Sequence, residues 1–460
     1  MRTRFMPADA VPLSGPAEIA ARAAYVLRDN STDSATKAGP GLYPHQWSWD
    51  AGFNAIGLSR LDPRRAALEL DSLFAGQWGN GMVPHIVFDP AVDTYFPGAG
   101  RWECARLSDA APDRPATSGI TQPPVHALAA AEILATAARR GADEAQIARE
   151  WFATFQPKLL RWHRFLADDR TDPGTGLVVI HHGWESGLDN SPRWDGPSGR
   201  VVVGPDLQPF ARRDTAHVAD AAERPSDAEY DRYLWLVEEA KRAGYDPARM
   251  RETCSFAVGD VLFTAIFAAA SDLLADLTIA GTDSWSEGSA ATVDWLRDRA
   301  EAARLAVLAQ VDDATGLAAD VDVRTGEPLR TATIAGFAPL IAGAPDVLRR
   351  QLTAELTGPR WAGHPSLRWA VPPSTSPESP AFRPRTYWRG PVWPVMTWLL
   401  GWALERGGET GAATALRDAA LDQLREGSFA EYYEPVTGEP LGGPHQSWTA
   451  AVALAWLLDG

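Results

Sequence analysis

The sequence predicts an all-α protein in which paired helices close into a ring. Stretches with a helical period of apolar residues recur over most of the 460 residues, whereas strand-like runs are few and short. Short polar turns alternate with long loops rich in proline, glycine and aromatic residues, as expected where helices pair and the longer connections gather on one face. Acidic and aromatic motifs lie near both ends and in the middle of the chain, so we expect one domain over residues 1–460.

The helical period predicts each element in turn. Helices are expected over residues 16–29, 63–78, 125–140, 143–167, 226–243, 253–277, 285–311, 345–355, 392–406, 410–425 and 447–458. Ser226 and Glu229 have the spacing of a capping box, and Gly244 is placed to end the same helix. Strand-like runs occur at residues 177–181 and 201–204. Residues from about 193 to 225, rich in Pro, Gly and Asp, are interpreted as an excursion or lid over the functional face.

The charge balance excludes two classes of partner. A formal net charge of −16 and a pI near 5.0 argue against nucleic acid and against an anionic membrane surface, because both require basic patches. The apolar run at residues 448–458 is far shorter than the roughly 20 residues that cross a bilayer. If the substrate itself carries a carboxylate, the protein must supply a local arginine to hold it.

The two cysteines, Cys104 and Cys254, lie far apart and show no metal-ligand spacing. We therefore expect no cofactor and no metal. The first residues are charged but have no apolar core behind them, so no leader peptide is evident and a cytoplasmic protein is expected. A homo-oligomer is compatible with the sequence, which does not determine the oligomeric state.

Residues 181–195 form the most informative stretch of the chain. They combine three carboxylates, two indoles and two imidazoles with turn-forming residues. A site that cleaves sugars needs a carboxyl group with a raised pKa and aromatic planes for the apolar faces of a pyranose ring. The alternative is a turn-rich loop that happens to be acidic.

A second acidic and aromatic stretch favours the sugar-cleaving interpretation. It covers residues 429–438 and continues through residues 442–448 into the last expected helix. Glycosidic bonds are commonly hydrolysed by two carboxyl groups on opposite sides of the scissile bond, and these often come from distant parts of a chain. The two stretches together meet that requirement.

These motifs resemble glycoside hydrolase family 63 and, more distantly, the family 37 trehalases. The resemblance is carried by W-E-S-G-x-D-N-S-P at residues 184–192, F-x-E-x-Y at 429–433, and S-W at 447–448. The segments at 43–53 and 387–394 extend it over nearly the whole chain. The single-domain form and the segment around Arg224 and Tyr230 are most similar to the bacterial glucosylglycerate and mannosylglycerate hydrolases. The resemblance implies an (α/α)6 barrel whose functional loops meet on one face.

The resemblance also assigns the two carboxyl groups. By motif position the general acid is Asp189 and the general base is Glu431. Nearby indoles, Trp184 and Trp194, would keep the acid partly desolvated and raise its pKa. A base that activates water implies inversion, with the carboxyl groups roughly 6.5–9.5 Å apart.

Three further acidic residues compete for these roles: Glu185 and Asp195 compete with Asp189, and Glu434 competes with Glu431. Glu185 is interpreted as a hydrogen-bond orienter or a ligand of a sugar hydroxyl, and Glu434 as part of a turn. The adjacent His181 and His182 lie on a strand-like run, where neighbouring side chains point opposite ways, so a structural role is favoured over a pair of acid–base histidines.

Binding residues are expected around the two carboxyl groups. Trp47, Trp49 and Asp50 form an aromatic and acidic cluster for a sugar ring, although Trp49 alone fits helix-start packing equally well. Tyr95 is expected on a loop that closes over the substrate, and Arg224 is interpreted as a clamp for a substrate carboxylate. Motif position adds Tyr43, Gln122, Trp184, Glu185, Gly187, Tyr230, Tyr387, Trp388 and Gln446.

The sequence thus predicts an inverting glycoside hydrolase for a small anionic α-glucoside. Glucosylglycerate, yielding glucose and glycerate, is the first expectation and mannosylglycerate the next. An α-glucosidase or trehalase for a neutral disaccharide is the alternative among enzymes. A non-catalytic sugar-binding module is the alternative from another class, and it requires that Asp189 or Glu431 be misplaced.

Overall fold

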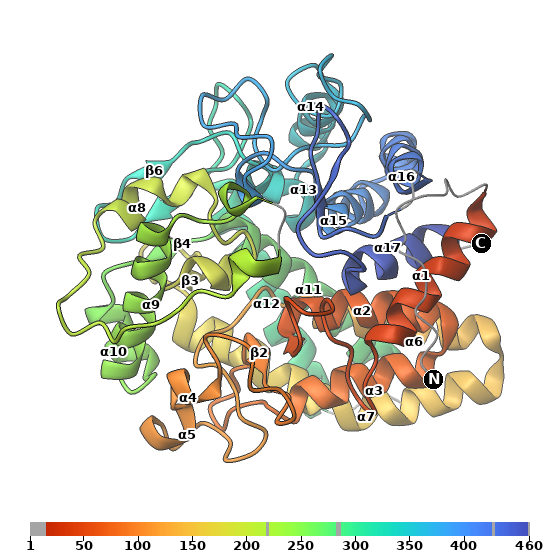
Figure 1. Ribbon diagram of the computed structural model, residues 1–460. Helices are drawn as coiled ribbons and strands as arrows, with labels where there is room; N and C mark the ends of the chain where they lie inside the picture. Colours follow the sequence, from red (N-terminus) through yellow and green to blue (C-terminus); the bar gives the residue numbers. More distant parts are fainter. Residues whose placement is uncertain (1–14, 218–219, 282–286, 426–427, 459–460) are drawn as a thin grey trace, which may run out of the picture.

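Six helices form the inner ring of the protein. The structure, a computed structural model, describes residues 15–217, 220–281, 287–425 and 428–458. Within these residues the inner helices are α2 (Ser48–Leu61), α6 (His126–Arg140), α11 (Val261–Ala280), α13 (Ala338–Ala342), α15 (Pro394–Arg406) and α17 (Ser447–Leu457). Each contacts the next in this order, and α17 packs on α2, which closes the ring (Figure 1).

Six outer helices cover this ring in the described part of the chain. They are α1 (Pro16–Asn30), α3 (Pro63–Phe74), α7 (Ala142–Phe165), α12 (Glu287–Leu308), α14 (Asp346–Thr357) and α16 (Thr410–Arg425). Outer and inner helices alternate along the sequence. The inner α2 and α17 are buried almost all round, whereas α3 and α14 bury one face. The expected (α/α)6 barrel is therefore confirmed.

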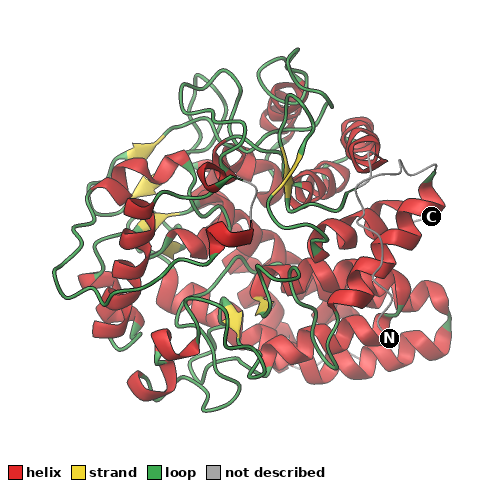
Figure 2. Cartoon of the chain, in the orientation of Figure 1, coloured by secondary structure: helices red, strands yellow, loops and turns green. Residues whose placement is uncertain are grey.

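Long connections carry the remaining elements, and they gather on one side of the helices (Figure 2). These connections contain the 16-residue helix α9 (Asp227–Arg242) and the shorter helices α4 (Ala99–Trp102), α5 (Cys104–Leu107), α8 (Asp195–Gly199) and α10 (Pro247–Thr253). Three small antiparallel sheets comprise β1 (Gln46–Trp47) with β2 (Ile86–Val87), then β3 (Val179–Ile180), β4 (Val258–Gly259), β5 (Asp320–Asp322) and β6 (Pro328–Leu329), and β7 (Tyr432–Tyr433) with β8 (Pro440–Leu441). Each sheet lies beside one of the sequence motifs.

Most expected helices are found within a few residues of their predicted bounds, and the capping box of Ser226 and Glu229 is formed at the start of α9. The helix expected at 253–277 was wrong at its start, because residues 258–259 pair with two strands and Asp260 caps α11 through the N–H of Phe263. Residues 201–204 are not a strand in the structure. The expected start of the helix at 285 lies outside the described residues.

Two inner helices, α2 and α13, were not expected. Both are buried on nearly every side, so they lack the polar face that makes a helical period visible. Helix α11 is also largely buried, and it is the one described helix long and apolar enough to cross a membrane. Its contacts with α6, α12 and α13 identify it as a core helix of the barrel.

A buried ion pair ties the loop after the first motif to the barrel. Arg193 donates to Asp320 on β5 at 2.8 Å, and both side chains are almost fully inaccessible. The same guanidinium donates to the carbonyl oxygens of Thr331 and Ala318, while Asp320 accepts the N–H of Val261 at the start of α11. The Arg193–Asp320 pair and these hydrogen bonds therefore join the loop after the first motif, the chain around β5 and the start of α11.

Replacing Arg193 by alanine should strongly destabilise the protein. Removal of one partner leaves the buried Asp320 carboxylate uncompensated, which typically costs about 3–5 kcal/mol. Urea-induced unfolding followed by circular dichroism measures this. Arg330→Ala, which breaks an exposed pair with Asp312, is the matched control and should change stability little. Similar small losses for both variants would contradict the account.

Candidate active site

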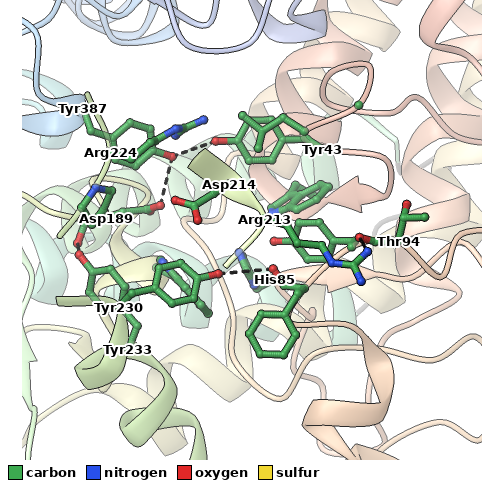
Figure 3. A pocket seen from close by; sticks show the side chains of 17 residues that line it. Tyr43, His85, Thr94, Asp189, Arg213, Asp214, Arg224, Tyr230, Tyr233 and Tyr387 are labelled. Atoms are coloured by element: carbon green, nitrogen blue, oxygen red, sulfur yellow. Dashed lines mark hydrogen bonds between the residues drawn. The ribbon is translucent and has the colours of Figure 1, made fainter. Parts of the chain in front are cut away.

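A cavity with two adjoining compartments lies among the long loops. Five residues line both compartments: Tyr43, Trp47, His85, Asp189 and Tyr387. The inner compartment is completed by Ala38, Trp49, Asp50, Gln122, Gly187, Trp388, Glu431, Gln446 and Trp448. The outer compartment, shown in Figure 3, is completed by Gly41, Leu42, Thr94, Tyr95, Phe96, Trp184, Arg213, Asp214, Arg224, Pro225, Tyr230 and Tyr233.

The structure brings fifteen of the sixteen expected site residues to this cavity. Glu185 is the exception, since it is fully buried and lines neither compartment. Its carboxylate accepts two hydrogen bonds from Arg170, at 2.9 and 2.7 Å, and further ones from the N–H groups of His181 and Thr121. Burial acts to raise the pKa of Glu185, but Arg170 and these donors outweigh it and hold the pKa below its ordinary value. This geometry favours the orienting role over the sugar-ligand role.

The loop that carries Asp189 is fixed on both sides. Gly187 has a φ of 74°, and a Cβ there would lie 2.6 Å from the Trp49 ring, so glycine is required. After Asp189, the Asn190 side chain accepts the N–H of Trp388 at 2.9 Å. The first motif therefore also holds the segment that carries Tyr387 and Trp388.

Asp189 is half-buried and lies at the junction of the two compartments. Desolvation raises the pKa of its carboxyl group to about 7, with the negative charge of Glu431 acting in the same direction. A hydrogen bond from Tyr387 and the charge of Arg224 oppose this rise. A substantial fraction of Asp189 is thus protonated near neutral pH, as a general acid requires.

Glu431 is held at the base of the β7–β8 hairpin. Its Oε2 accepts the N–H of Gly443 at 2.9 Å and a hydrogen bond from Arg224 at 3.1 Å. Gly442 has a φ of 71°, and a Cβ there would collide with the Glu431 carboxylate. These two donors and the close approach of Gly442 fix the position of the Glu431 carboxyl group.

Glu434, by contrast, closes a turn, because its side chain accepts from the N–H groups of Val436 and Thr437 and from the Thr437 hydroxyl.

Two phenols connect the carboxyl groups. Tyr43 donates to Glu431 Oε1 at 2.7 Å. The Tyr43 hydroxyl lies 3.2 Å from that of Tyr387, which in turn lies 3.3 Å from Asp189 Oδ2 (Figure 3). Tyr387 has a φ of 38°, a left-handed conformation that is uncommon for a bulky residue and tends to occur at functional sites.

The inner compartment combines indole rings with a buried acid. Trp49, in the first turn of α2, packs edge-on against Trp448 and next to Trp388, and Trp388 stacks on Trp393 with centroids 3.6 Å apart. Thus Trp49 both packs at the helix start and faces the cavity. Burial raises the pKa of Asp50 well above its ordinary value. Aromatic planes beside a carboxyl group suit a sugar ring with its hydroxyl groups.

The outer compartment contains two arginines and one further acid. The Arg224 guanidinium lies 4.6 Å from the centre of the Tyr387 ring and 5.7 Å from that of Tyr43. Its Nε is buried and has no hydrogen-bond partner among the described residues. Arg213 donates to the carbonyl oxygen of Thr94 across the compartment (Figure 3). Asp214 pairs with Arg212. The cationic groups all come from the segment interpreted as a lid.

Sequence reasoning missed several lining residues. His85, Arg213, Asp214 and Tyr233 belong to no motif, and only the lid interpretation placed two of them near the site. His85 stacks on Trp184, and burial lowers its pKa to about 3, so the ring is neutral.

The His181 and His182 rings lie outside both compartments and bond to the carbonyl oxygens of Phe256 and Tyr233, which fits a structural role. Across the described ranges, no group of three or more His, Cys, Asp or Glu side chains is arranged to hold a metal ion.

Comparisons with known proteins agree with this geometry. Residues 43–449 match the family model of the mannosylglycerate hydrolase MGH1-like glycoside hydrolase domain. A glucosylglycerate hydrolase of Mycolicibacterium hassiacum is 50% identical over 98% of this chain and all of its own length.

The solved structure of the family 63 mannosylglycerate hydrolase of Thermus thermophilus, in complex with Tris and D-glycerate, superposes with a TM-score of 0.84 at 40% identity. The match covers 95% of this chain and 99% of the other. The same enzyme was solved with glucose, with a TM-score of 0.82 at 38% identity over the same shares of both chains.

The neutral trehalase of Saccharomyces cerevisiae, at a TM-score of 0.53 and 14% identity over 93% of this chain and 73% of its own, shares the fold. The match of the family model over most of the chain and the identity with full-length relatives show that the protein belongs to the MGH1-like glycoside hydrolases of family 63.

Proposed function

We propose that the protein hydrolyses glucosylglycerate with inversion at the anomeric carbon, releasing glucose and glycerate. The observation that carries the proposal is the division of one cavity into an inner compartment lined by indoles and Asp50 and an outer one lined by arginines, with Asp189 at the junction. A sugar ring fits the first environment and an anionic aglycone the second. Mannosylglycerate, the substrate in the names of several relatives, is the second candidate.

The two carboxyl groups divide the reaction between them. Protonated Asp189 gives its proton to the leaving oxygen, while ionised Glu431 takes a proton from water that attacks the opposite face of the sugar. The three contacts through Tyr43 and Tyr387 limit the separation of the bonded carboxyl oxygens to about 9 Å. This limit is compatible with the spacing of inverting enzymes.

Arg224 supplies a site for the glycerate carboxylate. One of its nitrogens bonds to Glu431, but Nε remains without a partner in the described residues and the side chain lines the outer compartment. Arg213 adds a second positive charge to the same compartment. Both residues lie within the segment from 193 to 225, and we infer that this segment, together with Tyr95, closes over the bound aglycone. The glycerate seen in the Thermus enzyme supports an anionic ligand for this family.

A substrate panel tests the proposal directly. Purified protein is incubated with glucosylglycerate, mannosylglycerate, glucosylglycerol, trehalose and maltose, and the released hexose is measured. The proposed function predicts the highest kcat/KM for glucosylglycerate, with weak activity on glucosylglycerol and the neutral disaccharides. Preference for trehalose or maltose would sink the proposal, and binding of all sugars without turnover would indicate a sugar-binding module.

Asp189→Asn and Glu431→Gln should each abolish turnover while retaining the fold and most substrate affinity. Removal of a positioned acid or base typically lowers the rate about 10²–10⁴-fold, and more where protonation of the leaving group is essential. Steady-state kinetics together with calorimetric titration of glucosylglycerate separate catalysis from binding. Near-normal activity of Glu431→Gln alongside an inactive Glu434→Gln would show that the base has been misassigned.

Arg224→Ala should impair two properties at once. Because Arg224 also pairs with Glu431, the variant should lose kcat on every substrate, the neutral glucosylglycerol included. Loss of the carboxylate contact should cost a further ~2–5 kcal/mol of binding free energy for glucosylglycerate relative to glucosylglycerol. This cost is measured as the change in the ratio of the two kcat/KM values. Equal losses on both substrates would mean that Arg224 acts through Glu431 alone.

A further inference from the structure

An unbroken chain of hydrogen-bonding groups joins the two candidate catalytic carboxyl groups. It runs from Asp189 Oδ2 to the Tyr387 hydroxyl at 3.3 Å, from there to the Tyr43 hydroxyl at 3.2 Å, and on to Glu431 Oε1 at 2.7 Å. Figure 3 shows the first two contacts side by side along one wall of the outer compartment. Protein groups alone complete this path, so no bridging molecule is needed.

The number of protons in this chain depends on the state of the carboxyl groups. Each neutral phenol has one proton, so the two phenols can supply only two of the three contacts. If both carboxyl groups were ionised, each phenol would donate to its own carboxylate and the contact between Tyr43 and Tyr387 would lack a proton. One proton on either carboxyl group completes all three hydrogen bonds in a single direction. The chain is therefore matched to a pair of carboxyl groups that holds one proton.

After an inverting hydrolysis, the one proton of this pair is on Glu431 and no longer on Asp189. Asp189 has given its proton to the leaving oxygen, and Glu431 has taken one from water. Before the next turnover, Glu431 must lose a proton and Asp189 must gain one. In most surroundings both steps would use the solvent, but here the two groups are already connected.

We propose that Tyr43 and Tyr387 return the proton from Glu431 to Asp189 after each turnover. The O–H bond of Glu431 breaks as a new O–H bond forms on Tyr43, the former Tyr43 proton passes to Tyr387, and the former Tyr387 proton passes to Asp189. Three protons each move by one hydrogen bond, both phenols end neutral, and no outside acid or base is consumed. Rotation of the Asp189 carboxyl group by half a turn then directs the proton toward the substrate in the cavity.

The surroundings give this transfer its direction. Arg224 and the Gly443 N–H both donate to Glu431 Oε2, whereas desolvation raises the pKa of the Asp189 carboxyl group. Burial also raises the pKa of Tyr43 and Tyr387 well above their ordinary values, so a free phenolate is disfavoured and the three protons move together.

Single-turnover and steady-state kinetics of Tyr387→Phe test the relay, which rests on the proposed acid–base pair. The variant keeps the ring packed against Trp393 and removes only the hydroxyl. With enzyme in excess at pH 7, the first turnover needs no return of the proton and should stay within about threefold of the wild-type rate. In dilute buffer kcat should fall about tenfold or more, and added imidazole, a small proton carrier, should restore it. The wild-type kcat should not respond to imidazole.

Tyr43→Phe should behave in the same way. Tyr432→Phe is the matched control, because its buried hydroxyl has no hydrogen-bond partner among the described residues and lies outside the chain of contacts. It should keep the wild-type kcat.

If Tyr387→Phe loses the first turnover and kcat in parallel, without rescue by imidazole, the phenol merely positions Asp189 and the relay is wrong. An unchanged kcat in dilute buffer would also overturn it. Turnover by Asp189→Asn or Glu431→Gln would instead overturn the acid–base pair itself.

Discussion

Asp189 and Glu431 line the same compartment of the cavity, and the mechanism that we propose requires them to hold opposite protonation states. Arg224 pairs with Glu431 at 3.1 Å, whereas no ion pair joins Asp189 to a cation among the described residues, so the two carboxyl groups have different surroundings. Arg224, the Gly443 N–H and the phenol of Tyr43 surround Glu431, whereas Asp189 lies where burial opposes its ionisation.

The asymmetry affects stability as well as chemistry. A carboxyl group whose pKa is about 7 in the folded protein and near 4 in the unfolded chain binds more protons when folded. Its contribution therefore destabilises the fold progressively as the pH rises from about 4 to 7. Buried ion pairs such as Arg193 with Asp320 and Arg170 with Glu185 surround the same loops and hold them in place against this effect. Glycines at 187 and 442 let the two loops approach the cavity closely.

Features that depend on residues close together in the sequence could be predicted, whereas contacts between distant residues could not. Asp189 and Glu431 lie in compact local motifs, and the amphipathic outer helices show their period, so both were accessible from the sequence. Helix α2 was not, because burial on nearly every side removes its polar face.

The phenol chain joins residues 344 positions apart, and no local pattern reports such a contact. Likewise, the hydrogen-bond partner of Glu185 could be identified only from the structure, where the π-helical turn Leu166–Arg170 brings Arg170 next to the Glu185 carboxylate.

We propose that Asp189 and Glu431 act on opposite faces of the sugar in a single displacement. Proton NMR of the anomeric signals during the first minutes of glucosylglycerate hydrolysis tests it most directly, before mutarotation mixes the anomers. Because water enters opposite the departing glycerate, the account predicts that β-glucose appears first. Initial release of α-glucose would contradict it, since retention requires a covalent intermediate and a carboxyl group that acts as nucleophile.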